Sequence, residues 1–136
     1  MTPDAPAAKE KIMRTTPALL TFAAMLALAA PAMAADAANG KELFGACAKC
    51  HAITAEGDDT LVGPTLKGVV GRKAASIEDF RYSSAMRASG ITWTEQTLKE
   101  YIADPQAKVK GNRMALKSTF EPNEIDDIIA YLKTLN

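Results

Sequence analysis

The sequence has few of the residues that build metal sites and disulfide frameworks, since its 136 residues include two cysteines and one histidine. A structural zinc site normally takes four protein ligands, so cysteine and histidine alone cannot complete one here. An excess of one charge is also missing, because 16 Lys and Arg balance 16 Asp and Glu. Such a balance does not point to nucleic acid as a partner. The length suits one modest domain.

Both cysteines and the histidine fall in one stretch, Cys47-Ala48-Lys49-Cys50-His51. This order is typical of c-type haem attachment. Each thiol can form a thioether with one haem vinyl group, and the next imidazole can then bind the iron. A disulfide is an alternative in an exported protein. A thioredoxin-like pair is another, but it would need a βαβ context that this sequence does not show. The stretch predicts one covalent haem c on Cys47 and Cys50, with His51 as iron ligand.

Residues 1–34 have the three regions of a secretory signal peptide. A basic start formed by Lys9, Lys11 and Arg14 precedes an apolar run over 17–30, and an A-x-A site ends at Ala34. We expect cleavage there, a haem domain over 35–136, and export to the periplasm.

An uncleaved membrane anchor is the alternative to cleavage. The apolar run is shorter than the ~20 residues that a membrane span needs. The stretch before Met13 contains an aspartate and two prolines, which is unusual for a signal peptide. We therefore expect Met13 to be the true start.

The remaining sequence predicts an all-α domain with long loops, including one over 53–72. For a helix in the middle of the domain, Thr92 (in a Thr-x-x-Glu capping box) and Thr94 are rival first caps. That helix must stop before Pro105. The other expected helices run from Asp36 to about Cys47, from Ser83 to Ser89 before Gly90, and from about Pro122 towards the C-terminus.

The sixth ligand of a haem iron can be narrowed by elimination. Without a second histidine, the chain offers Met, Lys or Tyr, and Met with His is the pairing that raises the potential of electron-transfer cytochromes. Beyond residue 34 the methionines are Met86 and Met114. Met114 lies in a loop that Gly111 allows to turn, so we predict Met114 as ligand and Met86 as a core residue. Pro64 is a suitable acceptor for the other ring N–H of His51.

Several short motifs in a fixed order resemble the class I cytochromes c of bacteria and mitochondria. Besides CAKCH they are GPTL at 63–66, GRK at 71–73, GITW at 90–93, YIADP at 101–105, Met114, and IIAYL at 128–132. The resemblance spans residues 39–136. It implies a fold in which the N- and C-terminal helices cross, near Gly40/Phe44 and Ile128/Tyr131, and long loops wrap round one haem.

The resemblance also implies roles for single residues. Arg72, Tyr82 and Trp93 would hold the haem propionates. Tyr101 would lie near the Met114 sulfur, and Asn112 could donate to a propionate. The family's ligand loop usually reads Pro-Gly-Thr-Lys-Met, whereas this one is Lys110-Gly111-Asn112-Arg113-Met114. Without the proline, we expect a looser loop and a Met–iron bond that is easier to displace.

The predicted function is one-electron transfer between membrane-bound or periplasmic redox complexes, by a monomer that is not an enzyme. A quinol–cytochrome c oxidoreductase is the expected donor, and a terminal oxidase or photosynthetic reaction centre the expected acceptor. Lys108, Lys110, Arg113 and Lys117 form a basic run without an acid, which we predict to dock acidic partners. The alternatives are a haem peroxidase or gas sensor with a displaceable sixth ligand, and a haem subunit of a permanent complex. The last would need an exposed apolar patch.

Overall fold

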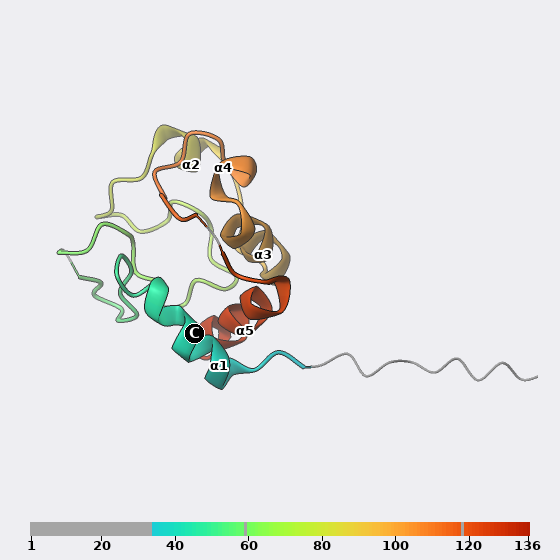
Figure 1. The fold of residues 1–136 in the computed structure, drawn as a ribbon. Coiled ribbons are helices and arrows are strands. Elements are labelled where there is room, and N and C mark those ends of the chain that lie inside the picture. The colour runs from blue at the N-terminus through green and yellow to red at the C-terminus, as the bar shows by residue number, and fades with distance from the viewer. Residues whose placement is uncertain (1–33, 59, 118) are drawn as a thin grey trace, which may run out of the picture. The chain divides into compact units, whose positions relative to one another are not determined.

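A helix from the start of the domain and the helix at its end cross at the base of the molecule (Figure 1). The computed structural model describes residues 34–58, 60–117 and 119–136, which belong to one unit beginning at Met33. Its elements are α1 (Ala37–Leu43), the 3₁₀ turn η1 (Phe44–Ala46), α2 (Ser84–Ala88), α3 (Glu95–Ala103), α4 (Pro105–Lys108) and α5 (Pro122–Lys133). The expected all-α fold is confirmed. The residues described include no strand, only one isolated antiparallel bridge between Lys73 and Thr92.

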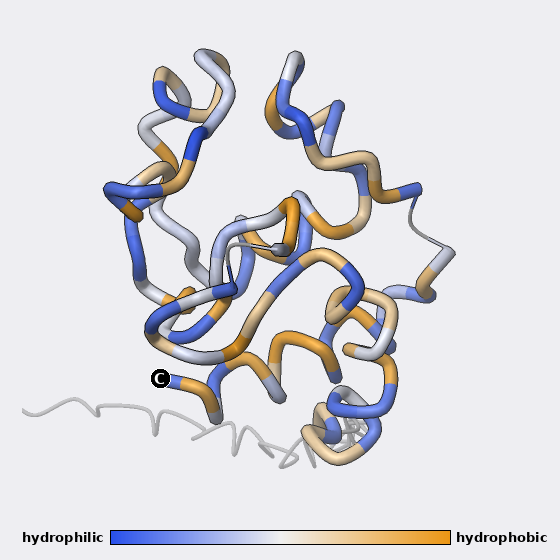
Figure 2. The backbone as a smooth tube through the Cα atoms, turned by 90° about the vertical axis from the view of Figure 1, so that its left-hand side faces the viewer, coloured by the Kyte–Doolittle hydropathy of each residue, from blue (hydrophilic) through white to orange (hydrophobic). Residues whose placement is uncertain are grey.

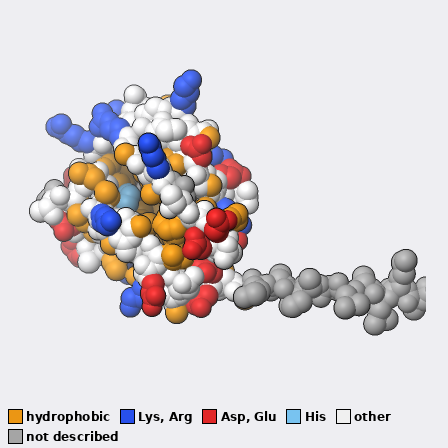
Figure 3. All heavy atoms as spheres, in the orientation of Figure 1, with side chains coloured by type: hydrophobic (Ala, Val, Ile, Leu, Met, Phe, Trp, Pro, Cys, Tyr) orange, Lys and Arg blue, Asp and Glu red, His pale blue; other side chains and the backbone are white. Residues whose placement is uncertain are grey.

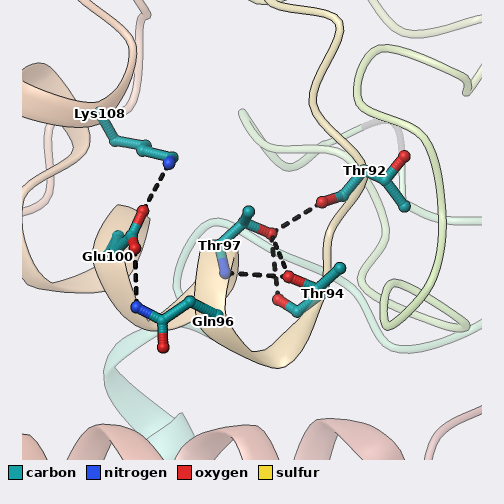
Figure 4. Close-up of polar contacts among 6 residues, drawn as sticks. All are labelled: Thr92, Thr94, Gln96, Thr97, Glu100 and Lys108. Atoms are coloured by element: carbon teal, nitrogen blue, oxygen red, sulfur yellow. Dashed lines mark hydrogen bonds and ion pairs between the residues drawn. The ribbon is translucent and has the colours of Figure 1, made fainter.

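Short polar side chains begin three of the helices, as the sequence predicts. Asp36 caps α1, and Ser83 caps α2 by accepting a hydrogen bond from a backbone N–H of the first turn. Of the two rival caps of α3, Thr94 is the one used, because its side chain accepts from the backbone N–H of Thr97. The expectation that Thr92 forms the capping box is wrong. Its carbonyl instead accepts from the Thr97 hydroxyl, 2.7 Å away (Figure 4).

Helix α4 was not predicted from the sequence. Helix α3 does end before Pro105, as expected, but Asp104 then starts a second helix at once. The Asp104 side chain accepts from the backbone N–H groups of Gln106 and Ala107. Pro105 occupies the first helical position, where its missing N–H costs nothing.

The crossing of α1 and α5 depends on a small residue. A Cβ atom on Gly40 would collide with the backbone carbonyl of Asp127, so only glycine allows this close approach. One turn further on, the rings of Phe44 and Tyr131 pack with their centroids 5.3 Å apart. The expected contact between the two terminal helices is therefore confirmed.

The side chain of Asp127 holds the two helices together from the outside. Its carboxylate accepts from the backbone N–H of Asp36 at 2.6 Å and from the side-chain amide of Asn39 at 2.8 Å. These two hydrogen bonds, the Asn39 bond first, lower the pKa of Asp127. The start of α1 is thus hydrogen-bonded to a residue of α5 that lies 91 positions later in the chain.

Helix α5 supplies much of the core. Apolar residues three and four apart form one buried stripe on it, made of Ile125, Ile128, Ile129 and Leu132. Figure 2 shows the resulting alternation of hydrophobic and hydrophilic residues along the helix next to the C-terminus. The stripe packs against α1 and α3. The long loop that follows η1 lies at the left of Figure 1, away from α3. In the parts of the chain that are described, none of the helices has the length and apolar character needed to cross a membrane.

Candidate haem site

The cysteines and the histidine lie on a turn that continues the helical path of α1 and η1. The backbone N–H of Cys47 donates to Phe44 O at 2.8 Å, and those of Cys50 and His51 both donate to Cys47 O at 3.0 Å. On such a turn, side chains three and four residues apart face the same way. The two thiols and the imidazole are therefore presented together. Both cysteines are free and half-buried, and burial raises the pKa of Cys47.

The imidazole of His51 is held by Pro64, as the sequence predicts. Its Nδ1 lies 2.7 Å from the Pro64 carbonyl oxygen. A carbonyl can only accept, so Nδ1 carries the proton, and Nε2 keeps the lone pair that can bind a metal. Burial lowers the pKa of His51, against the opposite effect of the Pro64 hydrogen bond. The neutral form, which is the form that can bind a metal through Nε2, is thus favoured by burial.

Gly63 sets the distance between the histidine and the loop that carries Pro64. Its backbone N–H donates to Cys50 O at 2.8 Å. A Cβ atom on Gly63 would lie 2.5 Å from His51 Cε1 and 2.7 Å from Cys50 O, so the loop can come this close only without a side chain. The sequence analysis placed Gly63 in the loop over 53–72 and missed this requirement. Its position directly before Pro64 was the available signal.

Apolar side chains surround the histidine. Figure 3 shows it among hydrophobic groups on the face that also carries the loops. Several apolar residues pack against the core yet stay partly exposed, among them Leu66, Tyr82, Met114 and Leu116. Covering partly exposed apolar side chains with a flat apolar group such as a haem would remove them from water, so the residues present fit such a group.

Of the three residues predicted to hold propionates, Arg72 and Tyr82 lie near each other. The guanidinium of Arg72 donates to the carbonyl oxygens of Thr65 at 2.7 Å and Lys67 at 2.6 Å. It has five N–H donors, so further donors remain for a carboxylate. Tyr82 is half-buried and close enough to interact electrostatically with Arg72, and burial raises the pKa of Tyr82. Trp93 is buried, and its ring centroid lies 4.9 Å from that of Tyr101.

The loop of Met114 is organised around Asn112. The Tyr101 hydroxyl donates to Asn112 Oδ1 at 3.1 Å, and burial raises the pKa of Tyr101 to about 12. Both amide hydrogens of Asn112 go to backbone carbonyls, whereas the sequence suggested a bond to a propionate. Met114 is half-buried, and Met86 is buried, as expected for a core residue.

One member of the predicted basic run is paired within the chain. The ammonium of Lys108 donates to Glu100 on α3, which also accepts from Gln96 (Figure 4). The sequence run contained no acid, but the fold brings one to it. The ion pairs among the described residues do not involve Lys110, Arg113 or Lys117, although the guanidinium of Arg113 donates to the carbonyl oxygen of Arg81 at 3.5 Å.

Residues 37–136 match the family model described as Cytochrome c. This chain belongs to the cytochrome c family. It is 45% identical to cytochrome c2 of Blastochloris viridis over 112 residues, which cover 82% of this chain and 87% of that protein. It is 46% identical to cytochrome c-550 of Bradyrhizobium diazoefficiens over 96 residues, covering 71% and 70%. The solved structure of cytochrome cH from Methylobacterium extorquens matches with a TM-score of 0.67 and 45% identity, over 73% of this chain and 98% of that one.

These matches establish the fold, the cofactor and the kind of function. This cytochrome c has the class I fold and carries one covalent haem c on Cys47 and Cys50. It is a single-haem electron carrier that exchanges electrons with redox complexes.

Proposed function

We propose that this cytochrome c is a closed carrier in which His51 and Met114 are the two axial ligands. The observation that carries the proposal is the hydrogen bond from His51 Nδ1 to Pro64 O, which leaves Nε2 free for a metal. The haem, when bound, would supply a one-electron iron couple, and a neutral thioether from Met114 together with the imidazole of His51 would favour its reduced form. Met114 lies in a hydrogen-bonded loop and is the only half-buried methionine among the residues described.

Other residues of the chain would anchor the edges of the haem. Arg72 has N–H donors left for a propionate, and its planar group can bind a carboxylate through two hydrogen bonds. Tyr82 and Trp93 would add a hydroxyl and an indole N–H from apolar bodies. Asn112 as a propionate donor is the weakest of these assignments, because both of its amide hydrogens are already bonded.

We further propose that the carrier works in the periplasm. The signal-peptide pattern of residues 1–34 supports export, although all of these residues except Ala34 lie outside the described part of the chain. Cleavage after Ala34 would leave Ala35 as the first residue, one position before the Asp36 cap of α1. N-terminal sequencing of the purified holoprotein should then begin at Ala35. A sequence beginning at Thr2 or Met13 would contradict cleavage.

The two ligands make an enzyme or gas sensor the less favoured function. A peroxidase or sensor needs an iron position open to a small molecule, and Met114 would occupy that position. A permanent subunit would need an extended apolar patch. Among the described residues, the exposed large hydrophobic side chains are Ile53 and Val62, and Ile53 is only 37% exposed.

Optical spectra of the holoprotein test the ligand assignment. Wild type and Met114→Ala would be recorded oxidised, dithionite-reduced, and reduced under carbon monoxide. We expect a low-spin reduced spectrum that carbon monoxide changes only in Met114→Ala. Met86→Leu serves as a matched control and should behave like wild type, because Met86 is buried in the core. Rapid carbon monoxide binding by wild type would contradict the closed carrier and favour a sensor or peroxidase.

We also propose docking through a basic patch formed by Lys110, Arg113 and Lys117. Figure 3 shows Lys and Arg side chains gathered on the side where α2 and α4 lie, with Asp and Glu below and to the right. Lys108 contributes less to the patch than its sequence neighbours, since Glu100 neutralises it. The partners we propose are a quinol–cytochrome c oxidoreductase as donor and a terminal oxidase or photosynthetic reaction centre as acceptor.

Charge reversal tests the docking surface. Lys110→Glu should slow electron transfer to an oxidase at low salt, and the difference from wild type should shrink as salt screens the charges. Lys41→Glu on α1 changes the net charge equally but lies on the other side of the fold, so it should have a smaller effect. Equal turnover of both variants and wild type at low salt would refute steering by this patch.

A further inference from the structure

Asn112 is a buried polar residue in a loop whose neighbours are exposed. Its exposed fraction is 7%, while Gly111 and Arg113 on either side are exposed. Burying an amide is unfavourable unless its hydrogen bonds are made inside the protein. The Asn side chain has two N–H donors and an oxygen with two lone pairs, so four bonds would satisfy it.

All four bonds are present in the structure. Nδ2 donates to Pro105 O at 2.7 Å and to Val109 O at 2.8 Å. Oδ1 accepts from the Tyr101 hydroxyl at 3.1 Å and from the backbone N–H of Met114 at 2.7 Å. The side chain therefore connects the main chain of Met114 to α3 and to both ends of α4.

Gln106 closes the same turn from the solvent side. Its Nε2 donates to Asn112 O at 3.1 Å, and its Oε1 accepts from the backbone N–H of Gly111 at 3.2 Å. Gly111 has a φ of 88°, a left-handed conformation that favours glycine. Two amide side chains, one buried and one exposed, thus define the path of the loop before Met114.

We propose that Asn112 is the positioning residue of Met114: it holds the backbone amide of Met114 in place and so keeps the thioether against the iron. The inference rests on the proposed ligation by Met114. The sequence led us to expect a loose loop, because the usual proline is missing. In this inference, the hydrogen bonds of the two amide side chains restrain the loop instead. It also gives Tyr101 an indirect role, since the one proton of its hydroxyl is bonded to Asn112.

Imidazole binding to the ferric holoprotein provides the test, because imidazole can bind only after Met114 has left the iron. Asn112→Leu keeps the size but removes all four bonds. A buried hydrogen bond that is lost or left unsatisfied shifts the equilibrium between bound and released Met114 by about tenfold or more. We therefore expect imidazole to bind at least about ten times faster. Gln106→Ala, at an exposed position, should change the rate in the same direction but less.

Two controls separate positioning from general loss of stability. Ile129→Val removes one buried methyl group on α5, away from the loop, and should lower the melting temperature while leaving imidazole binding unchanged. Gln96→Ala removes another exposed amide, which bonds to Glu100 and not to the loop, and should also leave it unchanged. If Asn112→Leu does not accumulate as holoprotein, Asn112→Ser together with Gln106→Ala takes its place.

The outcomes distinguish this inference from the ligand assignment. Slow imidazole binding in wild type and equally slow binding in the Asn112 and Gln106 variants would overturn the positioning role alone. Wild type that binds imidazole as fast as Met114→Ala would overturn ligation by Met114 and this inference with it. Faster binding in the Asn112 variant, with the two controls unchanged, is the expected result.

Discussion

The imidazole of His51 is fixed by two neighbours that act on different atoms. The carbonyl oxygen of Pro64 accepts a hydrogen bond from the N–H of Nδ1 and thereby sets the ring tautomer. Gly63 leaves no atom in the space beside Cε1, so the loop can approach the ring without pushing it. One residue orients the imidazole and the other gives it room.

Gly63→Ala is therefore expected to damage the haem site more than its size suggests. The new Cβ would lie 2.6 Å from His51 Nδ1, so either the ring or the loop must move and the hydrogen bond to Pro64 must weaken. We expect a lower yield of holoprotein and a changed iron–histidine vibration in its resonance Raman spectrum. Gly45→Ala is the matched control, because nothing lies within 4 Å of its added Cβ. A Gly63→Ala protein with wild-type yield and vibration would show that the site has more freedom than we infer.

Residues of the site differ in how far the sequence could reveal them. His51, Cys47 and Cys50 are adjacent in the chain, so their spacing alone indicates the chemistry. Pro64 could be expected because a metal-bound histidine needs an acceptor. The network of Asn112 could not, since two of its four partners, Pro105 O and Val109 O, lie at the ends of α4, a helix that the sequence did not reveal.

At the scale of elements, the join between α1 and α5 depends on pH. The folded-state pKa of Asp127 is lowered by its bonds to Asn39 and Asp36, so its carboxylate stabilises the fold above the ordinary pKa of an aspartate, about 3.9. This contribution is lost as the pH falls through the lowered pKa of the folded state.

Asp127→Asn should consequently destabilise the holoprotein at neutral pH and matter less in acid. Denaturant unfolding at pH 7 and at a series of pH values below 4 would measure the difference from wild type, which should shrink as the pH falls. Asp79→Asn, an exposed carboxyl in the loop before α2, is the control and should have little effect at either pH. A difference that is constant with pH would mean that the carboxylate charge of Asp127 is not what joins the helices.

The start of a helix could be predicted from the sequence where a single polar residue was available as its cap. Asp36 is the one short polar residue directly before α1, so that cap could be predicted, whereas at α2 the adjacent Ser83 and Ser84 are both good caps and only Ser83 is used. Thr92 and Thr94 compete, and Thr92, which forms the bridge to Lys73, is not the one that caps α3. Asp104 ends one helix and begins another, which a rule that reads proline as a stop cannot anticipate.

For the whole molecule, the apolar surface around His51 makes the haem part of the core. A domain of roughly 100 residues buries only a little over 60% of its surface on folding. Residues such as Leu66, Met114 and Leu116 are only partly covered by protein. Folding without the cofactor would leave them in contact with water.

A variant that cannot attach haem should thus be largely unfolded. We expect Cys47→Ser/Cys50→Ser to lose most of the helical circular-dichroism signal and to show no cooperative thermal transition. Lys49→Ala alters the same motif but keeps both thiols, and it should bind haem and fold. Native-like helicity with a sharp transition in the haem-free variant would show that the protein core suffices.

The contact between α1 and α5 also determines at what point of its synthesis the domain can complete its fold. The hydrogen bond from Asp36 to Asp127 joins residues 91 positions apart, and the two helices are the first and last of the described chain. A ribosome makes α1 early, but α5, the helix that it packs against, comes last. Until then Gly40 and Phe44 have no packing partner on α5, so a truncated chain without α5 is expected to leave this contact unmade.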